Sequence, residues 1–375
     1  MSAVPASFKA AVMPAPLSRH TVSDRSLAPV GPGEVAIKVT ATAINPVDWK
    51  IRDQGILIGE DKDKYPAVLG SDAAGEVVDV GSDVTGFAKG DRVFFQGILT
   101  RYDYCTFQQY CKMPAELVSH TPKNISDEQA AGVQLALMAV VTGFYHKTGH
   151  SLAPGPWDEA NGGRSVGKGK AIVILGGSSS VGQYAIQMAR LSGFEKIVTN
   201  SSASHIDHLK ALGAHVVLDR KTQAKAEDFR DALGDLPLEF VWDSIAEKET
   251  GKLGIDILRL AKVSGERQVV CVWNPNDNPN PMVGPYPEVT EAGQAKEPKV
   301  AVKQILGLGS GPEHRYVSEP VVKALGGEDG WVAKGLFKPN RPLVLDGGLA
   351  ALDKALDMNK EGVSGQKIVI KPQET

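Results

Sequence analysis

Cysteine is scarce in this chain, with 3 residues among 375, at Cys105, Cys111 and Cys271. A disulfide framework needs a larger, even set of cysteines, so we expect no disulfide framework and three reduced thiols. A structural zinc site would need four clustered cysteines, and only Cys105 and Cys111 lie near each other, at a CxxxxxC spacing. The cysteine content therefore excludes both kinds of cross-link as the basis of the fold.

The chain also lacks a surplus of positive charge and any long apolar run. Its 41 Lys and Arg residues against 44 Asp and Glu give a net charge of −3, so we expect no nucleic-acid partner. No apolar run approaches the ~20 residues that a membrane-spanning helix needs. The first residues, MSAVPASFKAAVMPAP, carry no basic segment followed by a long apolar core. We therefore expect no secretion signal, no membrane partner and a cytoplasmic protein.

The composition is that of a soluble globular protein, with 42% hydrophobic and 23% charged residues, and the length favours two domains. Alternating residues and Gly/Pro turns over 8–125 predict a small, mostly β domain, and 125–147 predicts a helix. From residue 170 onward strands alternate with helices, which is typical of an α/β domain with a parallel sheet. The Pro- and Asn-rich segment 274–299 predicts a lid or substrate-facing loop, with a plain surface excursion as the alternative.

A glycine- and serine-rich turn organises the second half of the chain. Lys170–Leu175 reads as a buried parallel strand, the turn GGSSSVG follows it, and a helical pattern then leads to a second strand at Lys196–Asn200. Strand, turn, helix and strand in this order predict a dinucleotide-binding unit, although the turn alone would also fit a plain structural role. Backbone N–H groups and the helix dipole would face the pyrophosphate. The residues predicted to bind it are Gly176, Ser178, Ser179, Ser180, Val181 and Gly182.

The end of the second strand predicts which nucleotide is bound. An enzyme that binds NAD usually places Asp or Glu there, whereas this chain has Asn200 followed by a serine-rich segment. A carboxylate ~4 Å from a 2′-phosphate would cost about 4 kcal/mol at an effective dielectric near 20, so its absence favours NADPH as the cofactor. Ser204 has a simpler alternative role as the cap of the next helix. The residues predicted to hold the 2′-phosphate are Ser201, Ser202, Ser204, His205 and Arg220.

Five motifs in the correct order resemble the medium-chain dehydrogenase/reductase superfamily over almost the whole length. The chain looks most like its zinc-independent branch of quinone oxidoreductases and fungal enoyl reductases, in particular the ToxD-like enoyl reductases that serve polyketide synthases in trans. The motifs are Ala43-Ile44-Asn45-Pro46-Val47-Asp48, Leu69-Gly70-Ser71-Asp72-Ala73-Ala74-Gly75, Phe87 to Val93, the nucleotide turn, and Val363-Ser364-Gly365-x-Lys367.

The resemblance implies a split architecture in the α/β class. A GroES-like β-barrel, the catalytic domain, would comprise residues 1–125, with 310–375 returning to it. A Rossmann domain with a doubly wound parallel sheet, which binds NADP, would comprise 126–309. The active site would lie in the cleft, beyond the strand ends of the open α/β sheet.

The resemblance also bears on metals. Where alcohol-dehydrogenase members bind catalytic zinc, this chain has Asn45 and Ser71-Asp72, which remove the thiolate and imidazole ligands that zinc prefers. His146 and His150 have the i, i+4 spacing of a metal pair, but Gly149 indicates that the helix ends between them. We therefore expect no metal, and without a Lewis acid alcohol oxidation is poorly supported.

By the same resemblance, Lys50 is the first catalytic candidate, because its ammonium could stabilise an enolate and donate a proton. A solvated surface lysine is the alternative, and related quinone reductases have a tyrosine at the aligned position. Thr142 resembles a threonine near the nicotinamide, with a hydroxyl bonded back to its own helix as the alternative. Asp72 is expected to fix a turn or a backbone N–H. The remaining residues predicted to contact the cofactor are Asn45, Val47, Asp48, Trp49, Lys50, Val363 and Ser364.

These expectations leave three functions open. The first is an NADPH-dependent, zinc-independent reductase of activated C=C bonds, acting on free enones or on acyl thioesters that a polyketide synthase presents. The second is an NADPH:quinone oxidoreductase, which would use the same cofactor. The third is an NADPH-binding scaffold protein without turnover. The sequence itself favours chemistry through the cofactor turn and the cleft motifs, but it sets no substrate length.

Overall fold

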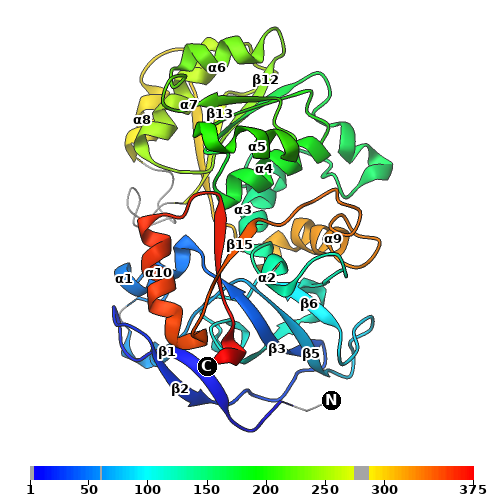
Figure 1. Cartoon of the computed structure of the whole chain (residues 1–375). Helices are drawn as coiled ribbons and strands as arrows, with labels where there is room; N and C mark the ends of the chain where they lie inside the picture. The colour runs from blue at the N-terminus through cyan, green and yellow to red at the C-terminus, as the bar shows by residue number, and fades with distance from the viewer. Residues whose placement is uncertain (1–3, 60, 274–286) are drawn as a thin grey trace. The chain divides into compact units, whose positions relative to one another are not determined.

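The computed structural model describes residues 4–59, 61–273 and 287–375, and the chain forms two compact units (Figure 1). Unit 1 comprises Met1–Leu135 with Ser318–Thr375, and unit 2 comprises Ala136–Val317. The chain passes between the units within helices α3 (Gln134–Tyr145) and α9 (Arg315–Leu325). The boundaries expected from the sequence fall before both helices.

Unit 1 is built around a seven-stranded sheet with the order β15-β16-β3-β5-β6-β8, in which β7 also pairs with β3. Its strand pairs are antiparallel except for β15 and β16. Val35, Ile37 and Val39 of β3 lie in its core, and a small sheet β2-β1-β4 completes the mostly β domain predicted from the sequence. The strands are β1 (Phe8–Met13), β2 (Thr21–Arg25), β3 (Glu34–Ala43), β4 (Ala67–Val68), β5 (Ala73–Val80), β6 (Arg92–Phe95), β7 (Tyr110–Pro114), β8 (Val118–His120), β15 (Arg341–Leu345) and β16 (Gln366–Ile370).

Unit 2 contains a six-stranded parallel sheet with the order β11-β10-β9-β12-β13-β14, which confirms the predicted doubly wound α/β class. Successive strands run outward from β9 in one direction and from β12 in the other, so the switch point lies between these two strands. Every residue of β9 is buried, as a strand covered on both faces requires. The strands are β9 (Ala171–Leu175), β10 (Lys196–Ser201), β11 (Val216–Asp219), β12 (Leu238–Asp243), β13 (Gln268–Val272) and β14 (Ala301–Ile305).

Helices connect the strands of unit 2 and flank the sheet of unit 1. In unit 2 they are α4 (Ser180–Leu191), α5 (Ile206–Leu212), α6 (Ala226–Leu233), α7 (Lys248–Leu260) and α8 (Pro287–Gln294). In unit 1 they include α1 (Pro46–Gln54), α2 (Asp127–Ala130) and α10 (Leu352–Glu361).

The helix expected over residues 125–147 is divided into α2 and α3. Ser126 caps α2 through a bond that its hydroxyl accepts from Gln129 N–H at 3.3 Å. At the break, a Cβ on Gly132 would lie 2.7 Å from Cγ of Lys367. A single helix was therefore the wrong prediction, and Lys367 from the far end of the chain leaves no room for a side chain at Gly132.

The segment 274–299, predicted to be a lid or a surface loop, is only partly described. Residues 274–286 lie outside the described residues. Pro287–Gln294 forms α8, whose Ala292 carbonyl accepts a bond from the Arg259 guanidinium at 2.8 Å. This part of the segment is a helix bonded to Arg259 of α7, where the sequence analysis expected a loop.

Candidate functional site

The turn that follows β9 is so tight that it needs glycine at its first and last positions. Gly176 has φ +75°, and a Cβ there would lie 2.4 Å from Cδ1 of Ile245. A Cβ on Gly182 would lie 2.2 Å from the carbonyl oxygen of Gly176. The turn therefore presents backbone rather than side chains at the start of α4, which is the arrangement that an anionic group needs at a helix N-terminus.

Ser179 is the N-cap of α4. Its hydroxyl accepts a hydrogen bond from Gly182 N–H at 3.0 Å and donates to the Gly176 carbonyl at 2.9 Å. This hydroxyl therefore shapes the turn, and a direct contact with a cofactor stays a prediction. Three more residues predicted to bind the pyrophosphate are half-buried beside it: Ser178, Ser180 and Val181.

Asn200 fastens the turn to the neighbouring strand. Its side-chain oxygen accepts a hydrogen bond from Gly176 N–H at 2.8 Å, and its carbonyl accepts one from Gly177 N–H at 3.1 Å. In the sequence, Asn200 stands out only as the end of a predicted strand. A polar residue that follows a buried apolar run was the one signal that could have indicated this role.

The residues predicted to hold a 2′-phosphate gather at the end of β10. Ser201 is 3% exposed, and its hydroxyl has no partner among the described residues. The hydroxyls of Ser202 and Ser204 lie 3.2 Å apart, and the exposed Arg220 donates its backbone N–H to the Ser201 carbonyl at 2.9 Å. His205 is the N-cap of α5, and no side chain caps that helix. The alternative that Ser204 caps α5 is therefore wrong.

A carboxylate that the sequence analysis did not weigh lies beside these residues. Asp219 ends β11 and stands in register with Ser201. Its Oδ1 accepts a hydrogen bond from Lys221 N–H at 3.1 Å, and Arg220 follows it directly. The end of β10 therefore has an acidic residue, Asp219, and a basic residue, Arg220, beside it. The acidic residue can be recognised only from the pairing of β10 with β11.

A second loop at the switch point begins where β12 ends. Oδ1 of the buried Asp243 accepts hydrogen bonds from Ile245 N–H at 3.0 Å and Ala246 N–H at 3.1 Å, and Oδ2 accepts one from the Thr250 hydroxyl at 2.6 Å. Burial raises the pKa of Asp243 to about 6. Ala246 has φ +60°, a strained value for a residue other than glycine. Ile245, 39% exposed, thereby lies against the nucleotide turn, and the sequence analysis missed this loop.

Thr142 lies in α3 within unit 2, and it is only 1% exposed. The next residue, Gly143, packs so closely on β12 that a Cβ there would lie 2.1 Å from Cζ3 of Trp242. This packing fixes the depth of α3 against the sheet. The predicted role of Thr142 near a nicotinamide stays a prediction.

The segment Asn45–Lys50 forms the N-cap and first turn of α1 in unit 1. Asn45 and Asp48 are buried, and Asn45 N–H donates to Asp48 Oδ2 at 2.8 Å. Their side chains therefore face protein groups, so a direct contact with a cofactor stays a prediction. Lys50 Nζ lies 5.6 Å from the centre of the Trp49 ring. The members of the segment that are half-buried are Val47, Trp49 and Lys50.

Val363 and Ser364 lie between α10 and β16 in unit 1. Val363 is half-buried and Ser364 is exposed. Their predicted contact with the cofactor stays a prediction.

Two histidines with the spacing of a metal pair have separate partners. His146 Nε2 lies 3.0 Å from the Glu313 carbonyl oxygen. His150 Nε2 lies 3.3 Å from a carboxylate oxygen of Glu239. In the described part of the chain, no group of three His, Cys, Asp or Glu side chains is arranged to hold a metal ion. The helices of residues 4–59, 61–273 and 287–375 also include none that is long and apolar enough to cross a membrane.

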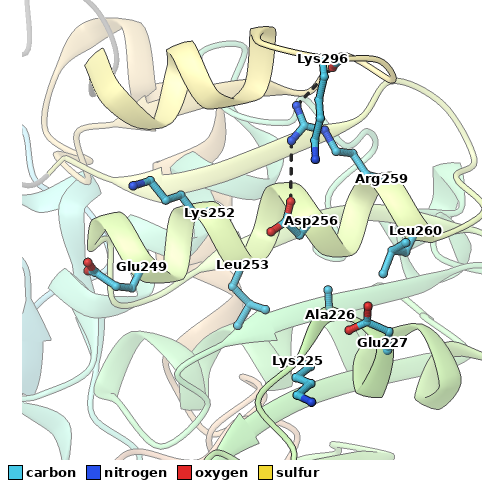
Figure 2. Close-up of a pocket in the computed structure, with 10 residues that line it drawn as sticks. All are labelled: Lys225, Ala226, Glu227, Glu249, Lys252, Leu253, Asp256, Arg259, Leu260 and Lys296. Atoms are coloured by element: carbon cyan, nitrogen blue, oxygen red, sulfur yellow. Dashed lines mark hydrogen bonds and ion pairs between the residues drawn. The ribbon is translucent and has the colours of Figure 1, made fainter.

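An open groove of 660 Å³ lies between α6 and α7, and none of the residues predicted for the site lines it (Figure 2). Acidic and basic side chains alternate along it, including Lys252, Asp256 and Arg259. Arg259 lies 3.7 Å from Asp256 and donates to the Lys296 carbonyl at 3.2 Å. Such alternation is typical of a solvated helix surface, so we assign the groove no role in the site.

Two family descriptions match the chain, an alcohol dehydrogenase GroES-like domain over residues 31–126 and a zinc-binding dehydrogenase domain over residues 180–270. The trans-enoyl reductase himH of Aspergillus japonicus is 30% identical over 347 residues, which cover 90% of this chain and 89% of that protein. The trans-enoyl reductase tndF of Aspergillus flavipes is 32% identical, with coverage of 96% and 98%. The first match confirms the GroES-like character expected of the β domain.

Solved structures show the same fold over the whole chain. The quinone oxidoreductase of Escherichia coli, determined in complex with NADPH, superposes with a TM-score of 0.66 at 18% identity. The match covers 98% of this chain and all of that one. At this identity the likeness shows the fold, which agrees with the architecture expected from the sequence.

Proposed function

The chain belongs to the medium-chain dehydrogenase/reductase superfamily, and from this premise we propose that it is an NADPH-dependent reductase of activated C=C bonds. The observation that carries the proposal is the glycine turn at the switch point, fastened by Asn200 and followed at once by the start of α4. Open α/β sheets bind their ligands at such a point. Two relatives that align over most of the chain are named trans-enoyl reductases, which supports a C=C bond as the reacting group.

The choice of NADPH is supported by the side chains at the end of β10. Ser201, Ser202 and Ser204 offer hydroxyls in place of the carboxylate that usually accepts the ribose of NAD. Asp219 on β11 opposes this choice, but Arg220 follows it and supplies a compensating charge. We therefore propose that the 2′-phosphate is held by these hydroxyls and by Arg220.

The chemistry needs a donor for the charge that develops on the substrate. NADPH, when bound, supplies a hydride to the β-carbon of an α,β-unsaturated carbonyl. We propose that the ammonium of Lys50 stabilises the resulting negative charge on the substrate oxygen and donates the α-proton, with water as the alternative source of that proton. Thr142 is the second polar candidate, as a hydroxyl near the nicotinamide.

The residues aligned with zinc ligands do not fit a metal ion. The ammonium of Lys367 donates to Asn45 and lies 3.9 Å from Asp72 Oδ2. A cation placed among these groups would be repelled by the ammonium, and neither thiolate nor imidazole is offered to it. The proposed mechanism is therefore independent of zinc, and hydride transfer to an activated C=C bond requires no Lewis acid.

The test combines cofactor binding with a substrate panel on the wild-type protein. We expect NADPH to bind more tightly than NADH in a fluorescence titration. We also expect NADPH oxidation with a small enone or a 2-enoyl thioester to exceed that with a quinone. Failure to bind NADPH would remove the proposal.

The same panel separates the other candidates. Preferential turnover of quinones would favour a quinone oxidoreductase, the activity for which the Escherichia coli protein is named. Tight NADPH binding without turnover of any panel member would favour a scaffold protein. A 2-enoyl chain on an acyl carrier domain, compared with the same chain on a free thioester, tests the proposed polyketide synthase partner.

A further inference from the structure

A lysine ammonium is buried inside unit 1, beside the start of α1. Lys367 of β16 is 4% exposed. Its Nζ donates to Oδ1 of Asn45, and it lies 3.9 Å from Oδ2 of Asp72. Asn45 Nδ2 also donates to Asp72 Oδ2, at 3.4 Å. The three side chains therefore form a closed set that joins the last strand of the chain to two early loops.

Each partner of Lys367 holds the start of a helix. Asn45 is the N-cap of α1, and its backbone N–H donates to Asp48 Oδ2 at 2.8 Å. Asp72 Oδ1 accepts the N–H of Leu135 at the start of α3, at 3.2 Å. The set therefore fixes the place where α1 begins, and α1 carries Trp49 and Lys50.

The charges of Asp48 and Asp72 make removal of the Lys367 ammonium costly. Asp48 and Asp72 are both 0% exposed, and Lys367 is the cation that acts on both of them. Burial raises the pKa of each carboxyl to about 7 and lowers the pKa of Lys367, although the ammonium attracts both carboxyls. Without the ammonium, two buried carboxyls would remain with no cation to balance them, which is costly in a protein interior.

We propose that Lys367 is a positioning residue for the reaction, because it joins Asn45 to Asp72 and thereby sets the start of α1 and the place of Lys50. The inference rests on the proposed function only in the use that it gives to Lys50. Lys367 is too deeply buried to touch a substrate, so it acts through the backbone of α1. Misplacing a catalytic group by ~1 Å can cost about 100-fold in rate.

The experiment uses three variants of the full-length protein. Lys367→Met removes the ammonium and keeps a side chain of similar length. The double variant Lys367→Met with Asp72→Asn removes one charge of each sign and so avoids adding an unbalanced buried charge. It therefore provides the decisive test if the single variant does not fold. Lys371→Met, four residues further along the chain, removes a half-buried lysine that pairs with Glu374 at 2.8 Å and serves as the matched control.

The first measurement is hydrogen exchange at the Asn45 amide, because that N–H reports the start of α1 directly. We expect exchange to rise at least tenfold in the single and double variants and to stay unchanged in the Lys371 control. The amide of Ile172 in β9 serves as the internal reference. Wild-type exchange at Asn45 in a folded double variant would overturn the inference, whatever the enzyme's activity.

The second measurement separates positioning from general damage. We expect the single-turnover rate of NADPH oxidation with an enone to fall about 100-fold, the cost of a ~1 Å misplacement, while NADPH affinity stays within about twofold. An unchanged rate in the double variant would also overturn the inference. Absence of turnover in the wild-type protein would instead remove the proposed function and leave the exchange result to stand by itself.

Discussion

The side-chain oxygen of Asn200 accepts a hydrogen bond from the backbone N–H of Gly176 at 2.8 Å. This bond joins the end of β10 to the turn after β9, the strand that borders the switch point. The carbonyl of the same asparagine accepts the N–H of Gly177. One residue therefore accepts the N–H groups of both Gly176 and Gly177 and ties the start of the turn to β10.

Replacing Asn200 tests whether its hydrogen bonds to the turn support cofactor binding. In Asn200→Ala the Gly176 amide loses its partner, a bond worth about 1 kcal/mol, so we expect NADPH affinity to fall about fivefold. In Asn200→Asp an oxygen can still accept the amide, but a charge is added at the end of β10. We expect this variant to lose more NADPH affinity than NADH affinity, because a carboxylate repels the 2′-phosphate.

Fluorescence titration with each nucleotide measures both effects. Ser264→Ala serves as the control, because its hydroxyl donates to the Leu238 carbonyl, which is remote in sequence from the turn. Equal losses of NADPH and NADH in Asn200→Asp would contradict the assignment of the 2′-phosphate to this strand end.

A second prediction concerns Lys50. Its half-buried ammonium lies 5.6 Å from the centre of the Trp49 ring, and we propose that it meets the charge on the substrate oxygen. In Lys50→Ala we expect single-turnover NADPH oxidation with an enone to slow by about 100-fold or more, as when a donor to an oxyanion is removed. NADPH affinity should change little.

The matched control for Lys50 is Lys89→Ala, since Lys89 is an exposed residue whose ammonium lies 2.8 Å from Asp79 Oδ1. A chemical rate in Lys50→Ala equal to that of the control would show that Lys50 is a solvated lysine. Thr142→Val is the next variant to measure in that event.

The sequence predicted the parts of the fold that depend on neighbouring residues. The β-branched run of β9, the glycine turn and the apolar face of α4 follow one another along the chain, so their order alone indicated the nucleotide-binding unit. The features that it missed depend on contacts between distant residues. The packing of Lys367 beside Gly132 joins the two ends of the chain, and the register of Asp219 with Ser201 appears only once the strands pair.

In the candidate site, the outcome does not follow the distance between residues along the chain. Asp72 was expected to fix a backbone N–H, and it accepts that of Leu135 at 3.2 Å. Asp243 was missed because its role depends on a loop that turns back on it through Ile245 and Ala246. Lys367 was read only as the end of a motif, since nothing in its local sequence indicates burial.

The pKa values of the buried carboxyls predict how stability depends on pH. Burial raises the pKa of Asp72 and of Asp48 from 3.8 to about 7. The folded state therefore binds protons more tightly than the unfolded chain, so their contribution to stability is fully present below pH 3.8 and is lost as the pH rises to about 7. Each carboxyl adds a slope of up to about 1.4 kcal/mol per pH unit inside this window.

Urea unfolding between pH 5 and pH 7 measures that slope. We expect it to be shallower in Asp72→Asn than in the wild type, because one of the two titrating groups is removed. Asp79→Asn is the control. The hydrogen bond from Lys89 lowers the pKa of the Asp79 carboxyl, so the titration of that carboxyl changes stability at pH values below the measured range. An identical slope in wild type and Asp72→Asn would show that Asp72 is already ionised in the folded protein at pH 5.

The closure of the nucleotide turn gives the last prediction. A Cβ on Gly182 would lie 2.2 Å from the Gly176 carbonyl and 2.8 Å from Cα of Gly177, both backbone atoms that cannot move without opening the turn. We expect Gly182→Ala to cost about 1–3 kcal/mol of unfolding free energy, as overpacking does, and to weaken NADPH binding at least tenfold. Gly265→Ala, where a Cβ meets nothing within 4 Å, is the matched control in the same unit and should leave both quantities unchanged.

Calorimetric titration with NADPH and urea unfolding measure the two effects separately. Loss of stability with wild-type affinity would mean that the turn serves only the packing of α4, and the plain structural interpretation of the glycines would then be correct.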